Sequence, residues 1–266
     1  MAETGRLRLS AAASLGLPLR PVTALRIAII VAVVVIWEAV SASGWLYRDV
    51  VPSLGAIGKA LYATLSDPTF YFHLGTTAYE IGIAMVIGGL SGLAVGILLG
   101  GSKFMSRAYE AYLYYLGPCP KIIFFPIMIM WFGVGPGSKV AMGAISCFFP
   151  VALNVAGGMR EIDKVLIRVG KSFRANTWQM VTKIYLPAMR HPVINGVRLG
   201  LGVALIGTLL AETKLSNRGI GFLVIQAYSI FNMPQMYALL IILFVIAIGA
   251  NTLIDRLGGL HDIKRS

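Results

Sequence analysis

The tripeptide Gly170-Lys171-Ser172 is the part of the sequence closest to a catalytic motif. It matches the end of the nucleotide-binding P-loop, Gly-x-x-x-x-Gly-Lys-Ser/Thr, which follows a buried strand and holds phosphates with backbone N–H groups. The first glycine of that motif is missing, because Val165 stands five residues before Gly170. Apolar residues before Lys171 recur at helical spacing, which indicates a helix rather than a strand. The sequence therefore predicts no P-loop and no ATP bound by this chain.

Other side chains that support catalysis are scattered. Cys119 and Cys147 lie in separate apolar stretches, without the spacing of a disulfide scaffold or a zinc site. Gly89-x-Ser91-Gly92 has the form of a serine-protease nucleophile motif, which would require a histidine base at membrane depth. The three histidines fall near or beyond the ends of the apolar stretches: His73, His191 and His261. The sequence predicts neither an enzyme nor a metal site.

The composition is typical of a membrane protein. Of the 266 residues, 57% are hydrophobic and 13% are charged, whereas soluble domains average about 25% charged residues. A membrane-spanning helix needs about 20 mostly apolar residues. Five stretches meet that requirement: 22–43, 76–101, 138–158, 193–212 and 234–255. The sequence therefore predicts an all-α, polytopic membrane protein.

A sixth apolar stretch, residues 108–132, is interrupted by Pro118, Pro120 and Pro126. Each proline lacks a backbone donor and disturbs the preceding turn of a helix. We expect a broken or kinked span covered by protein or by a cavity, because lipid does not satisfy exposed backbone groups. With this stretch the chain has about six transmembrane helices.

The first apolar stretch has two interpretations. A basic arm, residues 27–37 and Ser41-Ala42-Ser43 together have the layout of a secretory signal peptide. Glu38 and the long arm argue against cleavage, so we expect an uncleaved first span. The predicted organisation is an N-terminal arm at 1–21, a membrane domain at 22–257 and a tail at 258–266.

The formal net charge of +12 is explained mostly by membrane topology. In a six-span arrangement, most of the 23 Lys and Arg residues fall on the side that holds both termini and the long connection at 159–192. The positive-inside rule places this side in the cytoplasm. The sequence therefore predicts cytoplasmic termini and no nucleic-acid partner.

Glycines recur every four residues in the second span, at Gly88, Gly92, Gly96 and Gly100. Small residues at this spacing form a ridge that lets two helix backbones approach closely in lipid. The ridge predicts tight packing against a neighbouring span.

The connection at 159–192 is predicted to contain two short helices joined by a bend. The first has an apolar face made of Ile162, Val165, Leu166, Val169 and Phe173, and a basic face made of Lys164, Arg168 and Lys171. After a break at Ala175-Asn176, a capping-box pattern of Asn176 and Gln179 starts a second helix, and Pro187 is expected to end it.

The residues of this connection leave two interpretations open. An amphipathic helix with a basic face and Trp178 suits the surface of an anionic bilayer. The same features suit a docking element for a cytoplasmic partner.

The chain resembles the membrane subunit of ABC-type importers, the binding-protein-dependent permeases, over about residues 24–257. The resemblance is carried by Trp178-Gln179, Ile184-Tyr185-Leu186-Pro187, and Asn195-Gly196-Val197-Arg198-Leu199 leading to Ala211-Glu212. Further stretches are similar to the nitrate/sulfonate/taurine branch: Pro118-x-Pro120-Lys121, Trp131-Phe132-Gly133, Ser138-Lys139, Phe148-Phe149-Pro150, Gly219-Ile220-Gly221 and Leu253-Ile254-Asp255-Arg256.

One motif of this family departs from its usual form. The family's docking signature, E-A-A-x-x-x-G followed by I-x-L-P, falls here on Arg168-Val169-Gly170 and on Arg174 in place of the glycine. We expect Asn176, which tolerates left-handed geometry, to supply the bend that the glycine permits in the family. The basic residues also predict a partner with compensating acidic residues.

The resemblance implies a type I importer in a bacterial inner membrane. Two copies of this subunit, or this chain and a near relative, would form the pore, and a periplasmic or lipid-anchored binding protein would deliver the solute. Two separate cytoplasmic ABC ATPases would bind ATP and Mg²⁺ and dock on this chain, which would bind no cofactor. The implied docking residues are Arg168, Gly170, Lys171, Phe173, Arg174, Ala175, Asn176, Thr177, Trp178, Gln179 and Pro187.

Polar residues within the spans are candidates for the solute path, because ionisable groups in a membrane are often functional. The candidates are Lys121, Asn154, Thr208 and Glu212. Lys121 either attracts an anion or caps the broken helix, and Arg198 is expected to snorkel to water. The branch transports small anions, sulfonates, organic acids and pyrimidine precursors, and the residues do not name one.

A self-contained channel or secondary transporter is the competing class. It would explain six spans, but it leaves the bent, basic connection unexplained. The sequence also lacks an evident inverted repeat with paired broken helices, which many secondary transporters have.

Overall fold

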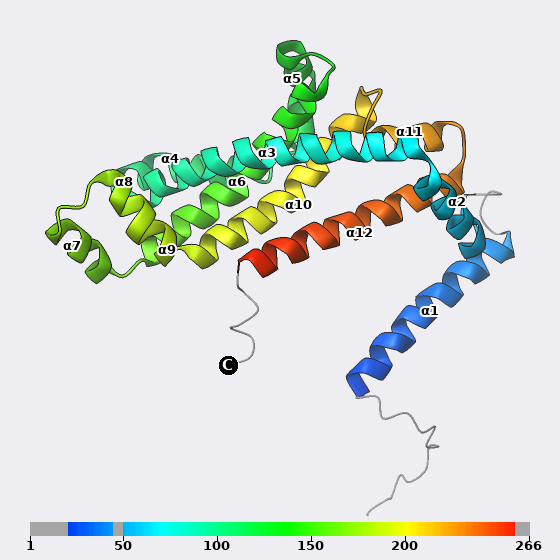
Figure 1. The fold of residues 1–266 in the computed structure, drawn as a ribbon, viewed down its shortest axis with the longest axis horizontal. Coiled ribbons are helices and arrows are strands. Elements are labelled where there is room, and N and C mark those ends of the chain that lie inside the picture. Colours follow the sequence, from blue (N-terminus) through cyan, green and yellow to red (C-terminus); the bar gives the residue numbers. More distant parts are fainter. Residues whose placement is uncertain (1–20, 45–49, 259–266) are drawn as a thin grey trace, which may run out of the picture. The chain divides into compact units, whose positions relative to one another are not determined.

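The computed structural model describes residues 21–44 and 50–258, and every regular element in that part of the chain is a helix (Figure 1). The predicted all-α membrane fold is confirmed. The chain divides after Leu54 into an N-terminal unit and a main unit. The predicted arm up to residue 20 and the predicted tail from residue 259 lie outside the described residues.

The N-terminal unit is built on α1 (Pro21–Ser43), which is long and apolar enough to cross a membrane. Proline suits its first position, because the first N–H groups of a helix have no partner within the helix. Residues 50–54 form hydrogen bonds with side chains of α1. Trp37 Nε1 donates to the Pro52 carbonyl at 3.1 Å, and the Leu54 N–H donates to Glu38 Oε2 at 3.1 Å. Glu38 therefore anchors the backbone at Leu54.

Four helices of the main unit are also long and apolar enough to cross a membrane. They are α3 (Pro68–Gly101), α6 (Pro136–Glu161), α10 (Arg190–Lys214) and α12 (Met233–Leu257). α3 begins eight residues before the predicted stretch, because Asp67 caps it by accepting from the Thr69 N–H at 2.8 Å and Pro68 fills its first position. α2 (Leu54–Ser66), which precedes it, is too short for the apolar-stretch criterion to predict.

The proline-containing stretch forms a broken helix, as predicted, and the bent pair is either a broken span or a re-entrant loop. α4 (Lys103–Leu116) is followed by a 3₁₀ turn, η1 (Lys121–Phe124), and by α5 (Phe125–Phe132). The two helical segments are bent by 93° relative to each other. α5 consequently stands out from the rest of the main unit (Figure 1).

The glycine ridge of α3 packs directly on α6, as predicted. A Cβ at Gly92 would lie 2.8 Å from the Phe148 carbonyl oxygen, and one at Gly96 would lie 2.6 Å from Val155 Cβ. Gly88 and Gly100 are equally close to backbone atoms of α6. The two helix backbones can reach this separation only because the ridge carries no side chains.

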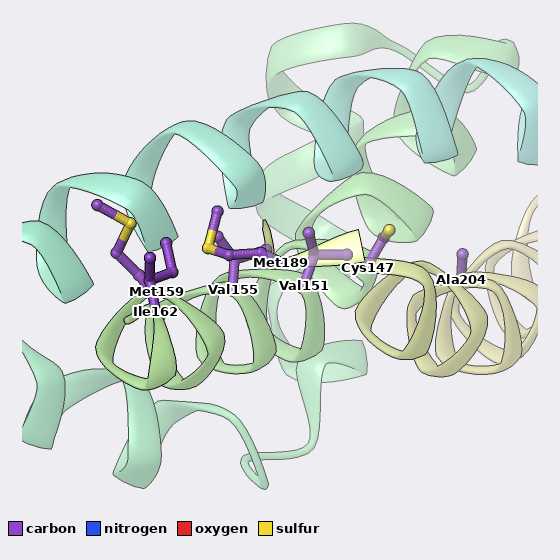
Figure 2. Close-up of a cluster of buried hydrophobic side chains, with 7 residues drawn as sticks. All are labelled: Cys147, Val151, Val155, Met159, Ile162, Met189 and Ala204. Carbon is purple, nitrogen blue, oxygen red and sulfur yellow. The ribbon is translucent and has the colours of Figure 1, made fainter. Parts of the chain in front are cut away.

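α6 supplies most of the largest buried apolar cluster of the main unit (Figure 2). Cys147, Val151, Val155 and Met159 recur along one face of it. The cluster continues through Ile162, Met189 and Ala204, so it joins α6 to the middle of α10 and to the connection between them.

That connection and α11 (Ile220–Ser229) lie at opposite ends of the main unit (Figure 1). We refer to these as the loop end and the α11 end. Around α11, a second apolar cluster contains Phe70, Ile220, Ala227, Leu239 and Ile242.

Candidate functional site

The loop end is formed by α7 (Lys164–Ser172), α8 (Thr177–Met180), the π-helical turn η2 (Val181–Tyr185) and α9 (Leu186–Ala188). α7 begins after Asp163, whose carboxylate accepts from the Val165 N–H at 2.8 Å. Ile162 was predicted on the apolar face of this helix, and this was wrong. It precedes the cap in an extended conformation and is buried in the cluster of Figure 2.

The other residues of the predicted apolar face of α7, and Trp178 of α8, are exposed to solvent. Phe173 is 83% exposed and Trp178 is 74% exposed, and Val165, Leu166 and Val169 are each about half exposed. Lys164, Arg168, Lys171 and Arg174 are exposed beside them. We call these nine residues the loop surface. Large apolar side chains grouped outside the core commonly mark an interaction site.

The bend after α7 is a Schellman motif, and its left-handed residue is Arg174. The Ala175 N–H donates to the Gly170 carbonyl at 3.0 Å and the Arg174 N–H donates to the Lys171 carbonyl at 2.9 Å. Arg174 has φ = 51°, whereas Asn176 is extended with φ = −72°. The expectation that Asn176 supplies the bend was therefore wrong. The position aligned with the family's glycine keeps the glycine conformation with an arginine.

Asn176 instead forms the predicted capping box. Its N–H donates to Gln179 Oε1 at 2.9 Å, and the Gln179 N–H donates to Asn176 Oδ1 at 2.8 Å. Both side chains satisfy N–H groups that the first turn leaves free, so the box fixes the start of α8 at Thr177.

Pro187 does not end the second helix, contrary to the prediction. The helical path continues to Ala188, and α10 begins at Arg190. The preceding π-helical turn explains this, because proline cannot form the regular bond of an α-helix and clashes with the carbonyl four residues before it. A wider turn at Val181–Tyr185 relieves that clash.

Gly170 has a packing role in the tripeptide Gly170-Lys171-Ser172. It is buried, and a Cβ there would lie 2.7 Å from Met180 Sδ. The Ser172 hydroxyl donates to the Arg168 carbonyl at 3.0 Å. The tripeptide is thus the last turn of α7, closely packed on the following helix.

The four candidate path residues lie at three separate places. Lys121 Nζ donates to the carbonyls of Gly117 and Cys119, at the break between α4 and α5. Of its two predicted roles, this geometry favours capping of the broken helix. Asn154 Nδ2 donates to the Pro150 carbonyl at 2.8 Å, and Asn154 lines a cavity of about 510 Å³ near the loop end.

Thr208 and Glu212 are fully buried towards the α11 end. Glu212 accepts from the Thr77 hydroxyl at 2.7 Å and from the Gly221 N–H at 2.6 Å. Two further ionisable residues near Glu212, Glu80 and Lys139, are each 1% exposed.

Sequence reasoning did not select Glu80 or Lys139. The available signal was the i, i+3 spacing of Thr77 and Glu80, which places two polar residues on one face of an apolar span.

Comparison with solved structures supports the fold. The chain aligns with a chain of the MetNI methionine ABC transporter, solved in inward-facing conformations, with a TM-score of 0.64. The alignment covers 73% of this chain and 98% of that chain at 20% identity. The chain is therefore a multi-pass helical membrane protein that has the fold of that transporter chain.

Comparison of sequences defines the family. Residues 74–265 match the family described as the binding-protein-dependent transport system inner membrane component, so the chain belongs to that family. This confirms the resemblance derived from the motifs.

Named relatives fall in the predicted branch. The taurine transport system permease of Escherichia coli is 30% identical over 73% of this chain and 72% of its own length. A putative aliphatic sulfonates transport permease of Bacillus subtilis is 28% identical over 80% of this chain and 78% of its own. The nitrate import permease of Synechococcus elongatus is 24% identical over 73% of this chain.

Proposed function

We propose that this chain is the pore-forming subunit of an ATP-driven importer that carries a small anionic solute into the cytoplasm. The relatives are named for nitrate, sulfonates and taurine. The proposed solute class also includes bicarbonate and small organic acids. Two copies of the chain form the pore in a bacterial inner membrane, with both termini in the cytoplasm. A periplasmic or lipid-anchored binding protein delivers the solute at the α11 end.

Two separate ATPase subunits dock on the loop surface and hold ATP and Mg²⁺. This chain supplies no hydrolytic residue and no cofactor site. The observation that carries the proposal is the exposure of Phe173 and Trp178 on a connection whose backbone is otherwise fixed by caps and packing. A rigid support keeps large apolar side chains in place for a partner at little entropic cost.

The same connection is joined firmly to two spans. Met189, which links it to α10, is fully buried in the cluster shown in Figure 2. Gly158 of α6 lies so close to Pro192 of α10 that a Cβ would meet the Pro192 side chain. A push on the loop surface would therefore be passed to α6 and α10 through close-packed atoms.

Co-purification with the ATPase encoded beside this chain tests the proposal. Phe173→Ala with Trp178→Ala is expected to abolish recovery of the ATPase, because aromatic anchors dominate most interfaces. Tyr62→Ala is the matched control, since Tyr62 is 76% exposed on α2 outside the loop surface. Solute uptake by the chain alone would instead support the ATP-independent channel or secondary transporter.

The charge of the loop surface defines the chemistry of its partner. The chain contains no Asp or Glu between Asp163 and Glu212, while four basic residues belong to the loop surface. An ATPase face with acidic groups around an apolar pocket would complement it.

Charge reversal tests this complementarity. Arg168→Glu with Arg174→Glu is expected to weaken assembly with the ATPase by at least tenfold and to remove its dependence on salt. Lys103→Glu with Arg107→Glu, on α4, is the control and should leave assembly unchanged. Unaltered affinity and salt dependence in the first variant would contradict an acidic partner face while leaving the docking role intact.

A further inference from the structure

Three ionisable side chains meet in the interior of the main unit, near the α11 end. Glu80 of α3, Lys139 of α6 and Glu212 of α10 are each at most 1% exposed. We call these three residues the polar cluster. Charged groups are rarely retained within membrane spans unless they are paired, because transfer from water costs several kcal/mol.

Glu212 is the member whose hydrogen bonds favour a negative charge. Its two carboxylate oxygens accept from the Thr77 hydroxyl at 2.7 Å and from the Gly221 N–H at 2.6 Å. The Thr77 oxygen in turn accepts from the Ile220 N–H at 2.8 Å. An ionised carboxylate only accepts hydrogen bonds, and both of these partners only donate to it.

These bonds hold the start of α11. Three consecutive N–H groups, of Gly219, Ile220 and Gly221, donate to His73 Nδ1, Thr77 Oγ1 and Glu212 Oε2. The first N–H groups of a helix have no partner within the helix. Here side chains of α3 and α10 supply every one of the three partners.

One carboxyl oxygen of Glu80 lacks a hydrogen-bond donor. Its Oε2 atom is buried and receives no hydrogen bond within the described part of the chain. Its carboxyl group lies beside the carboxyl group of Glu212. Two ionised carboxylates cannot form a hydrogen bond, whereas a protonated carboxyl group can donate to an ionised one.

Lys139 balances one negative charge. Its ammonium donates to the carbonyls of Val134 and Gly135 and lies close enough to Glu80 and Glu212 to interact with both charges. Two carboxylates and one ammonium would leave a net charge of −1 in a buried site. One proton on the carboxyl pair makes the cluster neutral.

We propose that Glu80 carries a proton and donates it in a hydrogen bond to Glu212, so that the polar cluster is a neutral clamp on the start of α11. The positive charge of Lys139 balances the negative charge of Glu212 without a direct ion pair between the two side chains. A bound metal ion is a poorer occupant, because the described residues contain no group of three His, Cys, Asp or Glu side chains able to hold one. The clamp fixes the α11 end, where the importer would receive its solute.

Infrared spectroscopy of the purified full-length protein at neutral pH tests the proton directly. A protonated carboxyl group gives a carbonyl band separate from the bands of carboxylates. We expect this band in the wild type, its loss in Glu80→Gln, and its retention in Glu161→Gln, whose parent side chain is an exposed carboxylate. Absence of the band from the wild type, or its persistence in Glu80→Gln, would overturn the proposal.

Thermal unfolding in detergent separates the roles of the two carboxyl groups. Glu80→Gln should unfold at the wild-type temperature, because an amide can replace a protonated carboxyl group as the donor to Glu212. Glu212→Gln should unfold earlier, because its NH₂ group would face the donors Thr77 or Gly221. Equal destabilisation by both variants would show that Glu80 is ionised, and the neutral clamp would be excluded.

Discussion

At the scale of single residues, Arg174 adopts a backbone conformation that glycine usually adopts. Its left-handed backbone completes the Schellman motif that ends α7. Left-handed geometry costs a residue with a Cβ roughly 1–2 kcal/mol. The chain accepts this strain at an exposed residue of the loop surface, where the guanidinium faces solvent or a partner.

Arg174→Gly is therefore expected to tighten the bend. Relief of the left-handed strain is partly offset by the greater freedom of glycine in the unfolded chain, which leaves a gain of up to about 1 kcal/mol. Hydrogen exchange of the Ala175 amide, which donates to the Gly170 carbonyl, reports this locally as slower exchange. Arg174→Ala is the control, because it removes the charge and keeps the Cβ. Equal protection in both variants would show that charge, and not backbone strain, governs the bend.

At the residue scale, local hydrogen bonds could be predicted from the sequence, whereas contacts between helices could not. The capping box of Asn176 and Gln179 was predictable because its bonds are local and follow a fixed spacing. The contact between Glu80 and Glu212 was not, because it depends on how α3 and α10 are rotated about their axes. The left-handed conformation of Arg174 was not predicted either, because the Schellman hydrogen bonds hold it against the usual preference of a residue with a Cβ.

At the scale of elements, hydropathy and proline predicted most of the helices. The broken helix followed from three prolines, and the ridge of α3 followed from the spacing of its glycines. The ends of helices were missed where caps extend beyond the apolar stretch, as at Asp67, and where a π-helical turn accommodates Pro187. Such features depend on backbone hydrogen bonds that hydropathy does not detect.

The contact between α3 and α6 gives a prediction at this scale. Gly96→Ala should lower the free energy of unfolding by about 1–3 kcal/mol, because the added methyl group would overlap Val155 and separate the helices. Gly89→Ala is the matched control on the same helix, since no atom lies within 4 Å of its would-be Cβ. Thermal unfolding in detergent compares the two. Similar midpoints would show that the helix pair tolerates a wider spacing.

At the scale of the whole molecule, the loop end and the α11 end of the main unit differ in the side chains that they carry. The loop end carries exposed apolar and basic side chains and no acidic residue between Asp163 and Glu212. The α11 end is fixed internally by the polar cluster. In the proposed importer, the loop end would engage the ATPase and the α11 end would receive the binding protein.

Labelling with a membrane-impermeant thiol reagent tests which end faces the cytoplasm. Cys119 is exposed and Cys147 is buried, so Cys119→Ser provides a background in which little reactive thiol remains. Ser172→Cys places a single thiol at the loop end, and Ser229→Cys places one at the α11 end. Both parent serines are exposed at the ends of helices.

The positive-inside distribution predicts that intact cells protect Ser172→Cys, whereas Ser229→Cys reacts from outside. Inverted membrane vesicles should reverse the pattern, which controls for differences in intrinsic reactivity. Labelling of Ser172→Cys in intact cells would place the loop surface outside and remove the basis for an ATPase partner. Protection of both thiols in intact cells would mean that the α11 end is covered. Addition of the binding protein to reconstituted complexes would then show whether that protein blocks labelling of Ser229→Cys.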